Sequence, residues 1–158
     1  MAAQFRTNLW DPVLIISQII ASQCTYYVGL GVWILIFDFW MGSVHSLYQI
    51  FSDKAVDYSS TSGRLGSIAF ILNSLWSAFG LWYIVGRAKQ CLDFAGTTLL
   101  IHFIFCTLYL HHIPGKWTWW IVNIVCLAIT SVLAEFLCMR TEMKAIPITT
   151  TSGGKSNI

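Results

Sequence analysis

Residues 117–139 read WTWWIVNIVCLAITSVLAEFLCM, and Glu135 is the only charged side chain among them. A bilayer core of about 30 Å is crossed by roughly 20 apolar residues of helix, because each residue advances the helix by about 1.5 Å. Three further stretches meet this criterion, at 13–37, 65–85 and 92–110. None has the alternating pattern of about ten residues that is typical of barrel strands, so the sequence predicts four transmembrane helices.

The composition of the whole chain supports a membrane protein. Of its 158 residues, 56% are hydrophobic and only 10% are charged, whereas soluble domains average about 25% charged residues. We therefore predict an all-α, polytopic membrane protein, built as a bundle of four transmembrane helices in a lipid bilayer. The formal charge of +2 and the absence of a basic run with interleaved aromatics exclude nucleic acid as an expected partner.

The four stretches are expected to form a single transmembrane domain over residues 1–140. A long connection, 38–64, joins the first two helices and ends in a loop-like stretch rich in Ser, Thr and Gly. The other two connections are short, so the second, third and fourth helices are expected to be antiparallel neighbours. Residues 141–158 are polar, and they are predicted to be a cytosolic tail that is largely disordered.

The distribution of lysine and arginine predicts the orientation in the membrane. Cytosolic flanks are enriched in these residues. With both termini in the cytosol, three basic residues (Lys54, Arg64, Lys116) are lumenal, and six are cytosolic: Arg6, Arg87, Lys89, Arg140, Lys144 and Lys155. We therefore expect cytosolic termini and a lumenal 38–64 loop.

Small side chains recur every four residues along the first predicted helix, at Ser17, Ala21, Thr25 and Gly29. Helices in lipid associate through close backbone approach, which small residues permit. The stripe therefore predicts a helix-packing surface.

Polar side chains inside the spans form a second group. The second span carries Asn73 and Ser77, and the fourth carries Asn123, Ser131 and Glu135 at multiples of four. They are expected to point into the bundle, where each interhelical hydrogen bond contributes about 1 kcal/mol. The alternative is that they line a polar cavity, as in a small transporter or channel subunit.

The depth of Glu135 decides its interpretation. A carboxylate deep in the membrane is a functional candidate, such as a proton relay. Glu135 is only five residues before Arg140, which favours a shallow position and an ion pair with Arg140 or Arg87.

The sequence contains no common catalytic motif, so we expect neither an enzyme nor a small-molecule substrate. His102, Cys106, His111 and His112 do not predict a metal site, because His102 lies more than two helical turns from the other histidines. No metal and no cofactor are therefore expected. Reversible acylation of Cys91 or Cys138 stays open as an alternative to unmodified apolar side chains.

Five strings of residues, taken together, resemble the Sys family of Golgi integral membrane proteins. Two of them are Lys89-Gln-Cys-Leu-Asp-Phe94 and Phe136-Leu-Cys-Met-Arg-Thr-Glu142, and the most specific pieces are Lys89 to Phe94 and Leu137 to Glu142. The other three are Gln4-Phe-Arg6 with Trp10-Asp-Pro12, Phe70-Ile-Leu-Asn73, and Thr118-Trp-Trp120.

The resemblance implies a four-span protein of the trans-Golgi with cytosolic termini. It also implies a receptor that recruits an Arf-related small GTPase, acetylated rather than myristoylated at its N-terminus, in vesicle-mediated protein trafficking. The family supplies no binding residues to transfer. From topology and motif membership we select the basic residues that are able to steer an acidic partner, although the topology rule alone also explains them: Arg6, Arg87, Lys89, Arg140 and Lys144.

Overall fold

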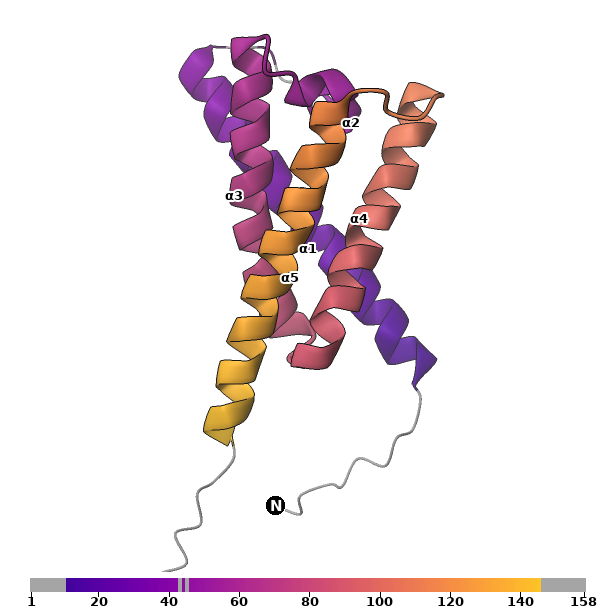
Figure 1. Ribbon diagram of the computed structural model, residues 1–158, viewed down its shortest axis with the longest axis vertical. Helices are drawn as coiled ribbons and strands as arrows, with labels where there is room; N and C mark the ends of the chain where they lie inside the picture. Colours follow the sequence, from indigo (N-terminus) through magenta and orange to yellow (C-terminus); the bar gives the residue numbers. More distant parts are fainter. Residues whose placement is uncertain (1–10, 43, 45, 146–158) are drawn as a thin grey trace, which may run out of the picture.

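The computed structural model describes residues 11–42, 44 and 46–145 (Figure 1). Its elements are α1 (Pro12–Met41), α2 (Tyr48–Phe51), the 3-10 helix η1 (Asp53–Val56), α3 (Thr61–Ile84), α4 (Ala88–Leu110) and α5 (Trp117–Ala145). The four longest helices are each long and apolar enough to cross a membrane, and no strand occurs in the described part of the chain. The predicted all-α class with four transmembrane helices is confirmed.

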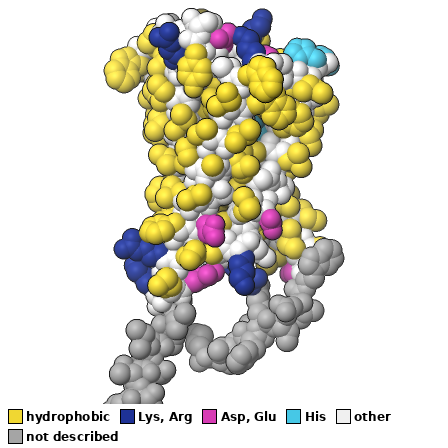
Figure 2. Space-filling model, viewed as in Figure 1, with side chains coloured by type: hydrophobic (Ala, Val, Ile, Leu, Met, Phe, Trp, Pro, Cys, Tyr) yellow, Lys and Arg dark blue, Asp and Glu magenta, His cyan; other side chains and the backbone are white. Residues whose placement is uncertain are grey.

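The long helices alternate in direction, which defines two ends of the bundle (Figure 1). We call the end at which α1 begins and α5 ends the terminal end, and the opposite end the loop end. Hydrophobic side chains cover the middle of the face in Figure 2, while charged side chains gather at both ends. This is the distribution expected for a bundle whose middle lies in hydrocarbon.

Local sequence explains where the helices start and stop. Pro12 occupies the first turn of α1, and the side chain of Asp11 accepts a hydrogen bond from Leu14 N–H at 3.3 Å. Gly42 ends α1 with a φ of 65°, a conformation that glycine adopts without strain. Ser60 caps α3 by accepting from Gly63 N–H at 3.1 Å. At about 1.5 Å per residue, the 30 residues of α1 are longer than the hydrocarbon core of about 30 Å, and α1 crosses the bundle diagonally (Figure 1).

Glycine and threonine set the distance between α1 and α3. A Cβ on Gly29 would lie 2.3 Å from Trp76 Cδ1, and a Cβ on Gly80 would lie 2.6 Å from Thr25 Cγ2. Thr25 and Gly29 of the small-residue stripe therefore lie in the α1–α3 contact. Of the other stripe residues, Ala21 is half-buried, whereas Ser17 is exposed and donates to Val13 O within α1.

The connection 38–64 is folded rather than a plain loop. It contains the end of α1, α2, η1 and the start of α3. Val56 of η1 is fully buried in an apolar cluster with residues of α3, α4 and α5, among them Phe70 and Trp119. The connection therefore covers the loop end of the bundle. At the other end, α5 continues to Ala145, so the first residues of the predicted tail are helical.

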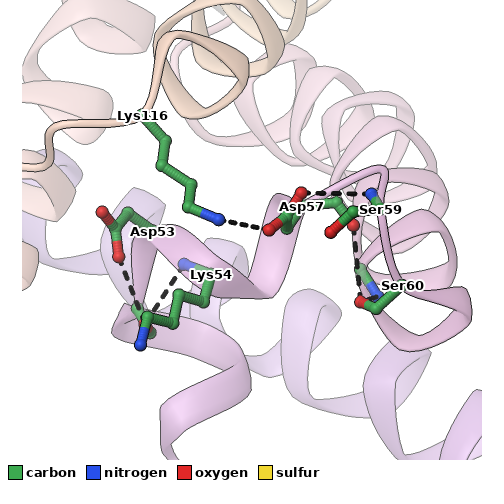
Figure 3. A network of polar contacts seen from close by, with 8 residues as sticks. Asp53, Lys54, Asp57, Ser59, Ser60 and Lys116 are labelled. Carbon is green, nitrogen blue, oxygen red and sulfur yellow. Dashed lines mark hydrogen bonds and ion pairs between the residues drawn. The ribbon is translucent and has the colours of Figure 1, made fainter.

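An ion pair between Lys116 and Asp57 joins this connection to the α4–α5 turn (Figure 3). The Lys116 ammonium lowers the pKa of Asp57 to about 2 by hydrogen bonding, and the backbone N–H of Ser59 contributes in the same direction. A carboxyl whose pKa is depressed on folding stabilises the protein above its unfolded pKa, and that contribution is lost as the pH falls through the folded pKa. The pair therefore stays formed throughout the mildly acidic range.

We expect Asp57→Asn to lower the thermal unfolding midpoint by the same amount at pH 7 and at pH 5, because Asp57 is ionised at both. The midpoint is measured on the detergent-solubilised protein, and Lys54→Gln is the matched control, since it removes a neighbouring exposed lysine outside the pair. A difference that is present at pH 7 and absent at pH 5 would contradict the assignment.

We expect Gly29→Ala to reduce the free energy of unfolding by about 1–3 kcal/mol, because the new methyl group overpacks the contact with Trp76. Gly31, two residues along the same helix, has no atom within 4 Å of the place where a Cβ would lie. Gly31→Ala is therefore the matched control, and denaturant unfolding in detergent compares the two. Equal effects of the two substitutions would show that Gly29 does not set the helix distance.

Candidate functional site at the terminal end of the bundle

Three contacts at the terminal end join α5 to α3 and to the start of α4. The backbone N–H of Ala88 donates to Glu142 Oε1 at 3.3 Å. The sulfurs of Cys91 and Cys138 lie 3.4 Å apart, and Trp82 Nε1 donates to Thr141 Oγ1 at 2.8 Å. We call these three contacts the clasp.

The clasp provides a hydrogen-bond acceptor for the first turn of α4, which has no local side-chain cap. Arg87 is the N-cap residue of α4, and its side chain makes no capping hydrogen bond. The first N–H groups of a helix have no partner within the helix, and a carboxylate there is also favoured by the helix dipole. Glu142, reaching across from α5, takes the place of a local cap. The start of α4 is therefore positioned by α5.

The clasp brings together segments that are distant in the sequence. Segment 89–94 contributes Cys91, and segment 136–142 contributes Cys138, Thr141 and Glu142. The sequence alone does not reveal this pairing, because spacing shows which residues share a helix face but not which neighbouring helix that face meets.

Charged side chains surround the clasp. Two basic residues lie at the start of α4 and two near the end of α5, all exposed: Arg87, Lys89, Arg140 and Lys144. Acidic side chains are exposed in the same helix ends, at Asp93, Glu135 and Glu142, and Figure 2 shows both signs near the lower end of that face. Arg6, the fifth predicted basic position, lies outside the described residues.

Apolar side chains are exposed at the same end, and Met143 was not singled out from the sequence. Tyr83, near the end of α3, is 90% exposed, and Met143 of α5 is 71% exposed. In Figure 1, α5 extends beyond α3 and α4 at this end. The terminal end therefore presents a projecting helix with mixed charge and exposed apolar side chains.

The polar residues predicted inside the spans are placed differently from one another. Asn73 is fully buried and donates to Tyr26 O of α1 at 3.2 Å. Asn123 and Ser131 are buried but donate to carbonyls of their own helix, those of Trp119 and Ala128. Ser77 is buried, and its hydroxyl has no hydrogen-bond partner. Only Asn73 of this group therefore joins two helices.

Glu135 is exposed, so it does not point into the bundle as predicted. Positions four apart drift around a helix by about 40° per step, because a turn has 3.6 residues. Over the twelve residues from Asn123 to Glu135 the drift reaches about 120°, and this carries Glu135 off the buried face. Neighbouring Ala134 and Cys138 are the residues of this turn that are fully buried.

Two cavities of the described structure bear on the transporter alternative. One, of about 20 Å³, is lined by residues of all four long helices, including Ser22, Ser77, Thr98 and Thr130. The other, of about 70 Å³, lies between α1, α2, η1 and α3 near the loop end. Asn73, Asn123 and Glu135 line neither cavity, so neither cavity joins these three residues.

The histidines are also separated. His102 is fully buried, with Tyr27 Oη 3.1 Å from Nδ1 and Cys106 Sγ 3.5 Å from Nε2, whereas His111 and His112 are exposed at the end of α4. Within the described part of the chain, no cluster of three or more His, Cys, Asp or Glu residues is arranged to hold a metal ion.

Comparison with known proteins identifies the family. A family model described as an integral membrane protein linking to the trans-Golgi network, SYS1, matches residues 5–148. The chain belongs to the SYS1 family. This confirms the resemblance found in the sequence and ties the chain, as a family member, to the trans-Golgi network.

Three SYS1 relatives resemble the chain over most of its length. It is 58% identical to a SYS1 homolog of Nematostella vectensis over 158 residues, which is all of both chains. It is 39% identical to a SYS1 homolog of Dictyostelium discoideum, over 91% of this chain and 62% of the relative. It is 30% identical to the SYS1 protein of Saccharomyces cerevisiae, over 77% of this chain and 60% of the relative. No solved structure matches.

All residues of the clasp lie within the segment matched by the SYS1 family model. We expect Glu142→Ala to reduce the free energy of unfolding by about 0.5–2 kcal/mol, the usual cost of a lost N-cap. Glu135→Ala, an exposed carboxylate on the same helix, is the matched control and should have little effect. Denaturant unfolding in detergent measures the free energy of unfolding of both variants. An equal decrease for the two variants would contradict the capping role of Glu142.

Proposed function

We propose that this SYS1-family protein is a receptor in the trans-Golgi membrane that recruits an Arf-related small GTPase and so supports vesicle-mediated protein trafficking. In this proposal the terminal end of the bundle faces the cytosol, and the partner docks on it. The observation that carries the proposal is the projecting, exposed end of α5, held by the clasp next to the start of α4 (Figure 1).

The orientation is supported by the distribution of basic residues. Arg87, Lys89, Arg140 and Lys144 are exposed at the terminal end, and Lys54, Arg64 and Lys116 belong to the connections at the loop end. An excess of lysine and arginine favours the cytosolic side of a membrane. Both termini of the helical bundle are then cytosolic, on the side where a cytosolic GTPase approaches.

The difference between the two ends supports the terminal end as the docking surface. At the loop end, the connection with α2 and η1 folds over the bundle and is tied down by the Lys116–Asp57 pair. At the terminal end, α5 projects, and Tyr83 and Met143 expose large apolar surfaces beside basic side chains. Large apolar side chains and Arg are typical components of protein interfaces.

The proposed partner also requires a receptor for stable attachment to the membrane. An amphipathic segment without an attached fatty chain binds membranes weakly, so stable attachment requires a second determinant. A protein surface at the membrane supplies one. The four basic residues are suited to steer an acidic face of the partner toward it.

The transporter alternative receives no support from the described residues. Asn73, Asn123 and Glu135 line neither of the two cavities described above, Glu135 is exposed, and the cavity between the four long helices measures only about 20 Å³. That volume suffices for one water molecule rather than for a solute.

We expect cells that lack this protein to lose the Golgi signal of the Arf-related GTPase, and re-expression of the protein to restore it. The measurement is imaging of the GTPase beside a Golgi marker. A Golgi signal that is unchanged in the absence of the protein would refute the receptor function.

Re-expression of the variant with Arg87, Lys89, Arg140 and Lys144 all changed to Gln tests the docking surface. We expect it to reach the Golgi but to restore the GTPase signal at least about tenfold less than the unchanged protein, since steering charges change association rates by 10-fold or more. Lys54→Gln, at the opposite end, is the matched control and should restore the signal fully. Full restoration by the fourfold variant would favour a scaffold role that does not use these residues.

A further inference from the structure

Two thiols from different helices meet at the centre of the clasp. Cys91, in the first turn of α4, and Cys138, near the end of α5, have their sulfurs 3.4 Å apart, and both side chains are fully buried. A disulfide has an S–S distance of about 2.05 Å, so the two sulfurs need to approach each other by only about 1.4 Å. This approach is small enough for side-chain rotation and a slight helix shift.

The other cysteines offer no such pair. Cys24 is exposed in the middle of α1, and Cys106 lies beside His102 Nε2. Among the described residues, Cys126 has no thiol within hydrogen-bonding distance. The Cys91–Cys138 pair is therefore a specific feature of the clasp rather than a consequence of many buried cysteines.

The pair lies next to the start of α4, which has no side-chain cap from its own N-cap residue. Cys91 is one turn from Ala88, whose N–H is capped by Glu142, and Cys138 is one turn from Glu142 itself. The side chain of Arg87, the N-cap residue of α4, makes no capping hydrogen bond. Both thiols are fully buried in an apolar cluster, and helix ends fray at low free-energy cost. We therefore expect transient opening of the adjacent ends of α4 and α5 to expose the thiols to reagents at the membrane surface.

We propose that Cys91 and Cys138 form a reversible redox modification site, which a small disulfide oxidant converts into an intramolecular disulfide between α4 and α5. One cysteine, as its thiolate, attacks the S–S bond of the oxidant and expels one small thiolate. The second cysteine attacks the resulting mixed disulfide and expels the other. Two protein thiols are oxidised to one S–S bond, the oxidant is reduced to two small thiols, and the two protein protons leave on them.

The proposed disulfide links α4 and α5 covalently at the clasp. Cytosolic thiols are normally kept reduced, so in the proposed orientation the pair is open at rest and closes under oxidation. The disulfide then replaces the noncovalent contact between Cys91 and Cys138, which is lost when the helix ends fray, with a covalent bond. The proposal rests on the thiol geometry and holds whether or not a GTPase docks at this end.

The full-length protein in opened membranes is used to test it. The membranes are treated with glutathione disulfide, and remaining thiols are blocked with N-ethylmaleimide in denaturing detergent, which exposes the buried cysteines. The protein is then reduced and labelled with polyethylene-glycol maleimide. We expect the unchanged protein to gain two labels in a gel shift, and peptide mass spectrometry before reduction to find the Cys91 peptide linked to the Cys138 peptide.

Cys91→Ala and Cys138→Ala should each abolish the doubly labelled band, leaving at most the single label of a mixed disulfide. Cys126→Ala, which removes another buried cysteine, is the matched control and should keep both labels. A singly labelled or unlabelled wild-type protein overturns the proposal without involving any variant. A doubly labelled band that survives Cys91→Ala or Cys138→Ala overturns it as well.

Discussion

The structure depends first on the hydrogen bonds of its own backbone. In hydrocarbon no water is available to pair with N–H and C=O groups, so each segment that crosses the membrane must satisfy them internally, as a helix does. The four long helices follow from that constraint. The hydrophobic effect, however, does not hold such helices together, because lipid tails are as apolar as the side chains. What joins them has to come from close packing and from polar side chains.

Several side-chain donors inside this bundle reach the backbone of a neighbouring helix. Gln18 donates to Ile84 O, Gln23 to Thr98 O, Asn73 to Tyr26 O and Thr130 to Ser74 O. Each carbonyl has two lone pairs, so it accepts this bond in addition to the bond within its helix. Such contacts contribute about 0.6 kcal/mol on average, but each fixes the register of one helix against another. Close packing at Gly29 and Gly80 fixes the distance between helices.

The helices were predictable because length and apolarity are properties of a single segment. Which helix faces contact each other depends on two segments together, and the predictions of these contacts were less complete. Asn73 was expected in the interior and is there, but Gln18 and Gln23, which also join helices, were not singled out because isolated glutamines carry no spacing signal. Glu135 was placed on the buried face because its spacing was treated as a strict multiple of four, although the helix drifts at that spacing. The clasp was missed altogether, since its partners are about fifty residues apart.

The asymmetry of the two ends follows from the same physics. At the loop end, the connection between α1 and α3 is long enough to fold back, and burial of Val56 together with the Lys116–Asp57 pair holds it over the bundle. At the terminal end, the α3–α4 connection is too short to fold over the bundle. The start of α4 has no local cap and is capped instead by Glu142 of α5, the helix that projects furthest. A partner that contacts the end of α5 therefore also contacts the segment that caps α4 and carries Cys138. The proposed binding surface and the proposed Cys91–Cys138 site involve the same two turns of α5, so we expect each to influence the other.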